Sequence, residues 1–131
     1  MLIRFNVKNL LSFNETQEFS MIAGNAITLP FEVYDKNDRL LNLNVQREII
    51  WTLGRCDDRE NFIVSKSSLG VGELEISSDE QGVFTVNIFT EDTMDLETNV
   101  YEYEVLIVTH SGQIIKPAYG KINIKECVKY Q

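Results

Sequence analysis

The stretch VYEYEVLIV, at residues 100–108, decides the fold class. Large side chains occupy every second position, and Glu102 and Glu104 lie between the first of them. This alternation predicts an extended strand with two unlike faces, because successive side chains of a strand point in opposite directions. The residues expected on the buried face are Tyr101, Tyr103, Val105 and Ile107.

The same period-two pattern recurs along the chain. It appears in REIIWTLGR at residues 47–55, in VFTVNIF at 83–89 and in GKINIKE at 120–126. Helical spacing extends for no more than two turns anywhere. We therefore expect short strands, with Trp51 as an anchor of the core. The side chains expected to share a face within each run are Ile49, Trp51 and Leu53, then Phe84, Val86 and Ile88, and finally Ile122 and Ile124.

The stretch ITLPFEVYDKNDRLLNL, at residues 27–43, predicts a strand that turns back on itself. ITLPFEVYD would be the strand, KNDR its turn, and LLNL at residues 40–43 the returning strand. Pro30 has no backbone N–H to donate, so it favours a sheet edge or a bulge. This stretch is expected to be architecture and not a reaction centre.

Turn residues separate the other runs. DEQG at residues 79–82 precedes a strand, and SG at residues 111–112 is expected at the tip of a hairpin. Residues 91–96 predict one helical turn, which Thr90 could cap. Short strands with regular turns and little helix indicate an all-β protein with a β-sandwich architecture.

Length and charge limit the classes of function. A chain of 131 residues suits one domain, and a net charge of -8 disfavours nucleic-acid binding, because phosphates repel acidic surfaces. The sequence contains no run of about 18 apolar residues, so we predict no membrane span. The N-terminal residues lack the apolar block of a signal peptide, so we expect no export by the general secretory route.

No catalytic or cofactor-binding motif emerges from the residues. His110 is the only histidine and lies beside Ser111, but neighbours on a strand point to opposite faces, so a turn position is the better interpretation. DKNDR at residues 35–39 begins like a calcium loop but has Arg39 where an oxygen ligand is needed. The adjacent acids at residues 79–80 and 91–92 are typical of solvated turns. We therefore predict a protein that is not an enzyme and binds no cofactor or metal.

Two features leave alternatives open. Cys56 and Cys127 lack the spacing of metal or redox sites; two reduced thiols are favoured, although the sequence does not exclude their pairing. Tyr101 and Tyr103 share a face, as residues that stack on sugars do, but tyrosines more often fill a core or an interface.

From Ala23 to Ile124 the chain resembles a small β-sandwich domain of bacteriophage and prophage structural proteins. It is similar to the immunoglobulin-like domains of tail and baseplate proteins, including the N-terminal part of baseplate upper proteins. The stretches that carry the likeness are AGNAITLPFEVYDKNDRLLNL, WTLGR, VSKSS, SSDEQGVFTVNIF, EDTMDL, YEYEVLIV and GKINI, in that order.

This resemblance implies an immunoglobulin-like antiparallel β-sandwich with a non-catalytic role. The chain would assemble into a tail, baseplate or neck particle by contacts with other phage particle proteins. It would be made in the bacterial cytoplasm and end in a virion or phage-like particle, without binding nucleic acid or membrane. The alternative is a β-sandwich binding module that recognises a carbohydrate or a peptide.

The first residues fall outside this likeness. We expect residues 1–20 to form an N-terminal strand or arm and residues 21–131 the β-sandwich domain. Such an arm could add a strand to a neighbouring copy, in a symmetric homo-oligomer. The candidate contacts of the arm are Leu2, Ile3, Phe5 and Val7.

Overall fold

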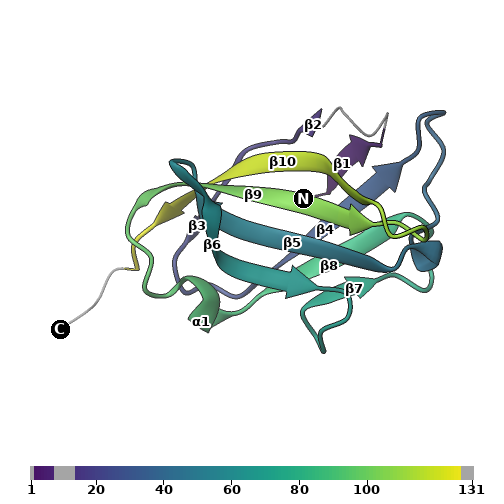
Figure 1. Cartoon of the computed structure of the whole chain (residues 1–131). Helices are drawn as coiled ribbons and strands as arrows, with labels where there is room; N and C mark the ends of the chain where they lie inside the picture. Colours follow the sequence, from purple (N-terminus) through teal and green to yellow (C-terminus); the bar gives the residue numbers. More distant parts are fainter. Residues whose placement is uncertain (1, 8–13, 128–131) are drawn as a thin grey trace.

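The chain folds into two β-sheets packed face to face, in a computed structural model that describes residues 2–7 and 14–127 (Figure 1). The four-stranded sheet has the order β1 (Ile3–Asn6), β4 (Ile27–Tyr34), β8 (Val83–Ile88) and β7 (Leu74–Ile76). The six-stranded sheet has the order β2 (Asn14–Glu15), β10 (Ile114–Lys125), β9 (Asn99–Val108), β5 (Glu48–Arg55) and β6 (Asp58–Ser67), and β3 (Phe19–Ile22) also pairs with β10. The two short helices are η1 (Leu43–Val45) and α1 (Thr90–Thr93).

The predicted β-sandwich is confirmed, and so are its buried faces. Every residue expected to point inward from the alternating runs is at most 1% exposed. Trp51 on β5 stacks on Tyr103 of β9, with 5.7 Å between the ring centroids. The indole N–H of Trp51 has no hydrogen-bond acceptor among the described residues, so Trp51 stabilises the core through apolar contact.

Of the strand or arm expected for residues 1–20, the structure shows a strand: β1 is the edge strand of the four-stranded sheet. Ile3 and Phe5 on β1 are 1% and 3% exposed, and β3 runs across the expected boundary between residues 20 and 21. Because Ile3 and Phe5 alternate with polar neighbours, β1 can bury both of them on one face. Residues 2–7 and 14–20 therefore share one core with residues 21–127.

The N-terminal strands also pair in parallel, whereas the other strand pairs are antiparallel. β1 runs parallel to β4, and β2 and β3 run parallel to β10. Parallel neighbours need a long connection between them. Along the sequence, β2 and β3 come between β1 and β4 and form part of this connection. Both lie in the opposite sheet.

The turn at residues 35–38 is present, but the returning strand predicted at residues 40–43 is wrong. Asp35 Oδ1 accepts the backbone N–H groups of Asn37 (2.8 Å) and Arg39 (3.0 Å), which fixes the turn. Beyond it the chain makes one isolated bridge, from Leu40 to Tyr34, and then enters η1. The side chain of Asn42 caps η1 by accepting the N–H of Asn44, a local bond that competes with strand pairing.

Pro30 lies in an inner strand, at a position where only one side of that strand is paired. β4 lies between β1 and β8, and Pro30 is opposite Thr85 of β8. The pairing with β1 begins one residue later, at Phe31. The missing N–H of Pro30 therefore falls outside the β1 ladder, although the strand is neither the sheet edge nor the bulge that the sequence predicts.

The predicted helical turn is confirmed as α1, with a different cap. Thr90 is the first helical residue and Phe89 is the N-cap. Asp92 Oδ2 accepts the backbone N–H of Phe89 at 2.7 Å. The same oxygen lies 2.7 Å from Nζ of Lys66, whose ammonium is also 4.2 Å from the centre of the Phe89 ring. Lys66 of β6, which is 5% exposed, therefore connects α1 to β6 through this ion pair and ring contact.

We expect Phe5→Ala to lower the free energy of unfolding by about 3–5 kcal/mol, because it removes a buried ring and leaves a cavity. Leu2→Ala is the control in the same segment, and it should change stability by less than about 1 kcal/mol because Leu2 is 38% exposed. Urea unfolding of both variants measures the difference. Equal effects of the two changes would contradict the assignment of β1 to the core.

We expect Asp92→Asn to destabilise the fold by about 3 kcal/mol, because the buried ammonium of Lys66 loses its counter-charge. Glu97→Gln is the control, since the Glu97–Arg55 pair has exposed side chains and should contribute less than about 1 kcal/mol. Urea unfolding at neutral pH tests both variants. A similarly small loss of unfolding free energy in both variants would show that the Lys66–Asp92 pair does not stabilise the packing of α1 on β6.

Candidate interaction surface

The histidine and the serine that could suggest nucleophilic catalysis belong to a surface turn. His110 and Ser111 lie exposed in the turn between β9 and β10, as the sequence predicts. The hydroxyl of Ser111 is 3.1 Å from Thr109 Oγ1, and these two hydroxyls share a hydrogen bond. This arrangement is a turn held by its own side chains.

The acidic candidates have local structural roles. Asp35 holds its turn and Asp92 holds both α1 and Lys66. Within residues 2–7 and 14–127, no three His, Cys, Asp or Glu side chains are grouped so that they could hold a metal ion. In the same part of the chain, no helix is long and apolar enough to cross a bilayer. Cys56 and Cys127 are thiols with exposed side chains.

The aromatic pair on β9 lies in the core. Tyr101 and Tyr103 are both 0% exposed. The hydroxyl of Tyr101 donates to the carbonyl oxygen of Glu97 at 2.8 Å, and that of Tyr103 is bonded to the hydroxyl of Thr16. Neither ring can stack on a ligand from solvent, so the carbohydrate-binding alternative loses the two residues on which it was based.

The outward faces of the two sheets differ in character. On the four-stranded sheet, Arg4 pairs with Glu32 at 3.0 Å, and Thr28 donates to Asn87 at 3.2 Å. Side chains of this kind satisfy one another on the surface and interact well with water. This outward face is therefore that of an ordinary solvated sheet.

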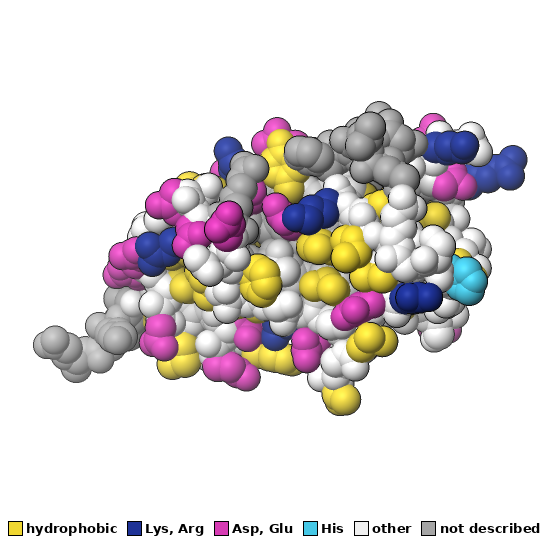
Figure 2. All heavy atoms as spheres, in the orientation of Figure 1, with side chains coloured by type: hydrophobic (Ala, Val, Ile, Leu, Met, Phe, Trp, Pro, Cys, Tyr) yellow, Lys and Arg dark blue, Asp and Glu magenta, His cyan; other side chains and the backbone are white. Residues whose placement is uncertain are grey.

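The outward face of the six-stranded sheet carries an apolar patch, which we call the outer patch. Ile50 pairs with Leu106, Val108 pairs with Ile114, and Leu106 and Val108 are two positions apart on β9. Side chains opposite each other or two apart on a strand lie on one face and touch. Hydrophobic side chains gather in the middle of this sheet face in Figure 2. The outer patch thus consists of Ile50, Leu106, Val108 and Ile114.

Charged groups border the outer patch. Lys116 and Glu104 lie beside it, with 3.8 Å between their charged atoms. Glu48 is opposite Val108, and its carboxylate accepts a hydrogen bond from the hydroxyl of Ser67. An apolar centre with a polar rim is the usual composition of a protein–protein interface. Ile114, at 63% exposure, is the most accessible member of the patch.

The predicted arm contacts lie elsewhere. Ile3 and Phe5 face the core, Val7 is partly buried against it, and Leu2 is 38% exposed. Only Leu2 therefore presents much side-chain surface. What β1 does present is its outer edge, which has no strand partner among the described residues. That the segment contacts another copy of the chain stays a prediction, and it would use backbone groups more than these side chains.

The sequence held a signal for the outer patch that alternation alone misses. The runs IIW at residues 49–51 and VLIV at 105–108 place apolar residues at consecutive positions. A strand with such a run has apolar side chains on both faces. One of those faces is the core, and the other must be covered by something else or remain exposed.

The comparison with solved structures bears on the fold. No protein-family profile matches the sequence, and no curated protein matches it. The structure matches the N-terminal domain of phage TP901-1 ORF48 with a TM-score of 0.60, over 95% of this chain and 97% of that chain, at 8% identity. CopC from Methylosinus trichosporium OB3b aligns with a TM-score of 0.38, over 63% of this chain and 67% of that chain, at 10% identity. The first match supports the resemblance to phage proteins at the level of the fold.

The buried tyrosines predict a loss of stability in alkali. Burial raises the pKa of Tyr103 and of Tyr101 above the usual value of 10.0. The unfolded chain therefore releases these protons first, and stability is fully present below a pH of about 10 and falls as the pH rises through the folded-state pKa values.

Urea unfolding between pH about 8 and about 11 should show this decline, and Tyr103→Phe should reduce it. Absorbance at the tyrosinate band gives an independent readout. If all tyrosines of the folded chain ionised together near their usual pKa, the two rings would not be buried as described.

Proposed function

We propose that the chain is a non-catalytic structural protein of a phage or prophage particle, which assembles into a tail, baseplate or neck by protein–protein contacts. The observation that carries this proposal is the match to the N-terminal domain of phage TP901-1 ORF48 over nearly the whole of both chains. The match covers 95% of this chain and 97% of that domain, which is more of the chain than the sequence resemblance covers.

The surface of the sandwich supports the same role. The outer patch is an apolar area of the kind that marks an interaction site when it is exposed and rimmed by polar residues. The buried aromatic residues and the locally bonded acids give no competing indication of a catalytic or sugar-binding cleft. On this proposal the outward face of the six-stranded sheet contacts another protein of the particle.

The chain should be present at stoichiometric abundance in phage-like particles purified after induction of the bacterium that carries the gene. Mass spectrometry of those particles checks this, and cross-links from Lys116 would identify the neighbour of the outer patch. Finding particles that lack the chain, while the chain is present in the soluble fraction, would overturn the proposal.

A pair of variants then tests the surface itself. We expect Ile114→Glu to fold normally but to reduce incorporation into particles at least about tenfold, because an unpaired carboxylate in an apolar contact weakens binding by more than about 1.4 kcal/mol. Thr28→Glu introduces the same charge on the outward face of the four-stranded sheet and should leave incorporation unchanged. Equal incorporation of both variants would place the contact elsewhere.

A further inference from the structure

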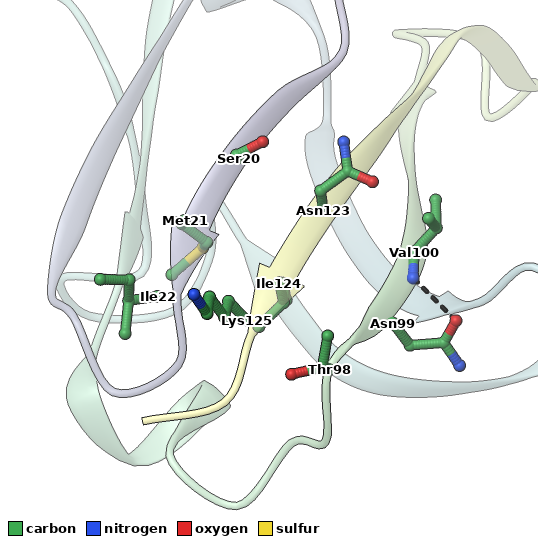
Figure 3. Close-up of a pocket in the computed structure, with 9 residues that line it drawn as sticks. All are labelled: Ser20, Met21, Ile22, Thr98, Asn99, Val100, Asn123, Ile124 and Lys125. Atoms are coloured by element: carbon green, nitrogen blue, oxygen red, sulfur yellow. Dashed lines mark hydrogen bonds between the residues drawn. The ribbon is translucent and has the colours of Figure 1, made fainter. Parts of the chain in front are cut away.

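Two hollows meet at one end of the sandwich, where β9 begins and β10 ends. The larger, which we call the apolar hollow, has a volume of about 530 Å³ and is lined by residues 20–22, 98–100 and 123–125 (Figure 3). The smaller, which we call the acidic hollow, has a volume of about 180 Å³ and is lined by residues 94–97 and 126–127. The chain between α1 and β9 contributes to both of them.

The apolar hollow presents hydrophobic side chains to solvent. Ile22 on β3 is 47% exposed and Val100 on β9 is 36% exposed, and they lie on either side of the end of β10 in Figure 3. The polar side chains beside them are bonded within the chain. Asn123 donates to Glu18 at 3.0 Å. Asn99 accepts the backbone N–H of Val100 at 2.8 Å. An apolar group can therefore enter this hollow without depriving these polar atoms of their partners.

The acidic hollow combines carboxylates with an exposed thioether. Asp95, Glu97 and Glu126 line it, and Met94 beside them is 49% exposed. Glu97 is paired with Arg55 at 3.2 Å. Within residues 2–7 and 14–127, the carboxylates of Asp95 and Glu126 have no such ion pair. Two carboxylates without a counter-charge favour the approach of a cation.

The two hollows share a wall. Thr98 and Lys125 line the apolar hollow, and their neighbours in the chain, Glu97 and Glu126, line the acidic one. The N–H of Glu126 donates to Thr98 Oγ1 at 2.8 Å, which holds the two segments of the wall together. Successive residues of an extended peptide are about 3.3 Å apart, so one short peptide can reach both hollows.

The charge around the hollows selects the kind of partner. Glu18 borders the apolar hollow, and together with the three acids of the acidic hollow it outnumbers the bases Lys125 and Arg55. On a chain of net charge -8, such a surface repels nucleic acids, anionic lipid headgroups and a second copy of the chain. It attracts a basic polypeptide, which can carry an apolar and a cationic side chain on neighbouring residues.

We propose that the two hollows bind a basic segment of another protein. This segment places an apolar side chain over Ile22 and Val100, and a lysine or an arginine beside Asp95 and Glu126. The apolar contact removes hydrophobic surface from water, and the cation supplies the missing counter-charge. Since charges at the surface are screened by salt, binding weakens as the ionic strength rises. The site lies at the opposite end of β9 from the outer patch, so it goes beyond the proposed function.

Selection from a random peptide library displayed on yeast tests this recognition. Counter-selection against the Val100→Asp chain retains peptides that depend on the apolar hollow. They should bind the wild-type chain at least about tenfold more tightly than this variant, since it places a charge in an apolar contact. Circular dichroism checks that the variant is folded, and Ile22→Asp replaces it if it is not. The retained peptides should carry a large apolar residue close to a lysine or an arginine. Retained peptides that are neutral or acidic, or a failure to retain any peptide, would overturn the proposal.

Charge reversal separates the acidic hollow from a general attraction between basic peptides and an acidic chain. The double variant Asp95→Lys, Glu126→Lys should bind the retained peptides at least about tenfold more weakly in calorimetry at low salt, because repulsion replaces attraction. The matched control is Asp79→Lys, Glu80→Lys, which changes the net charge equally at an exposed turn and should bind like wild type. Equal losses in the two double variants would overturn the proposal. The test uses no phage particle, so its failure leaves the proposed function standing.

Discussion

The contact between Phe31 and Tyr103 holds the two sheets together. Phe31 on β4 stacks on Phe84 of the same sheet, with 4.9 Å between centroids, and meets Tyr103 of the opposite sheet edge-on at 5.8 Å. Phe5 on β1 packs edge-on against Phe31, and Trp51 stacks on Tyr103. These rings form a continuous aromatic cluster across the sandwich, and their large buried area contributes much of the hydrophobic stabilisation of a chain this size.

That cluster explains why the N-terminal strand is not a separate arm. Phe5 and Ile3 complete the apolar layer at one edge of the four-stranded sheet, and on the opposite sheet the hydroxyl of Tyr103 is bonded to Thr16. The chain therefore contributes to both sheets before residue 23, the start of the sequence resemblance. The interaction surfaces must then be sought on the outside of the sandwich, where the two sheets differ: one face is polar and the other carries the outer patch.

Alternation predicted the inward faces well, because burial of one face is a local property of a strand. It could not predict which strands are neighbours. The pairing of Val108 with Ile114, which extends the outer patch, depends on register across two strands. The prediction of a returning strand after Arg39 was wrong for a related reason. Asn42 caps η1 through a local hydrogen bond, and the side chain of Leu43 is buried in the core. The sequence patterns also missed the exposed Leu69 and Val71, because two apolar residues beside glycines in a loop follow no period.

The parallel pairing of β3 with β10 has a mechanical consequence. β3 lies near the start of the chain and β10 near its end, and their hydrogen bonds run side by side along four paired residues. A force that pulls the two ends of the domain apart acts along these strands in opposite directions. The bonds are then loaded in shear and must fail together, whereas strands pulled apart from one end would separate one bond at a time. The pairing of β3 with β10 therefore resists tension between these two strands better than a hairpin of the same length would.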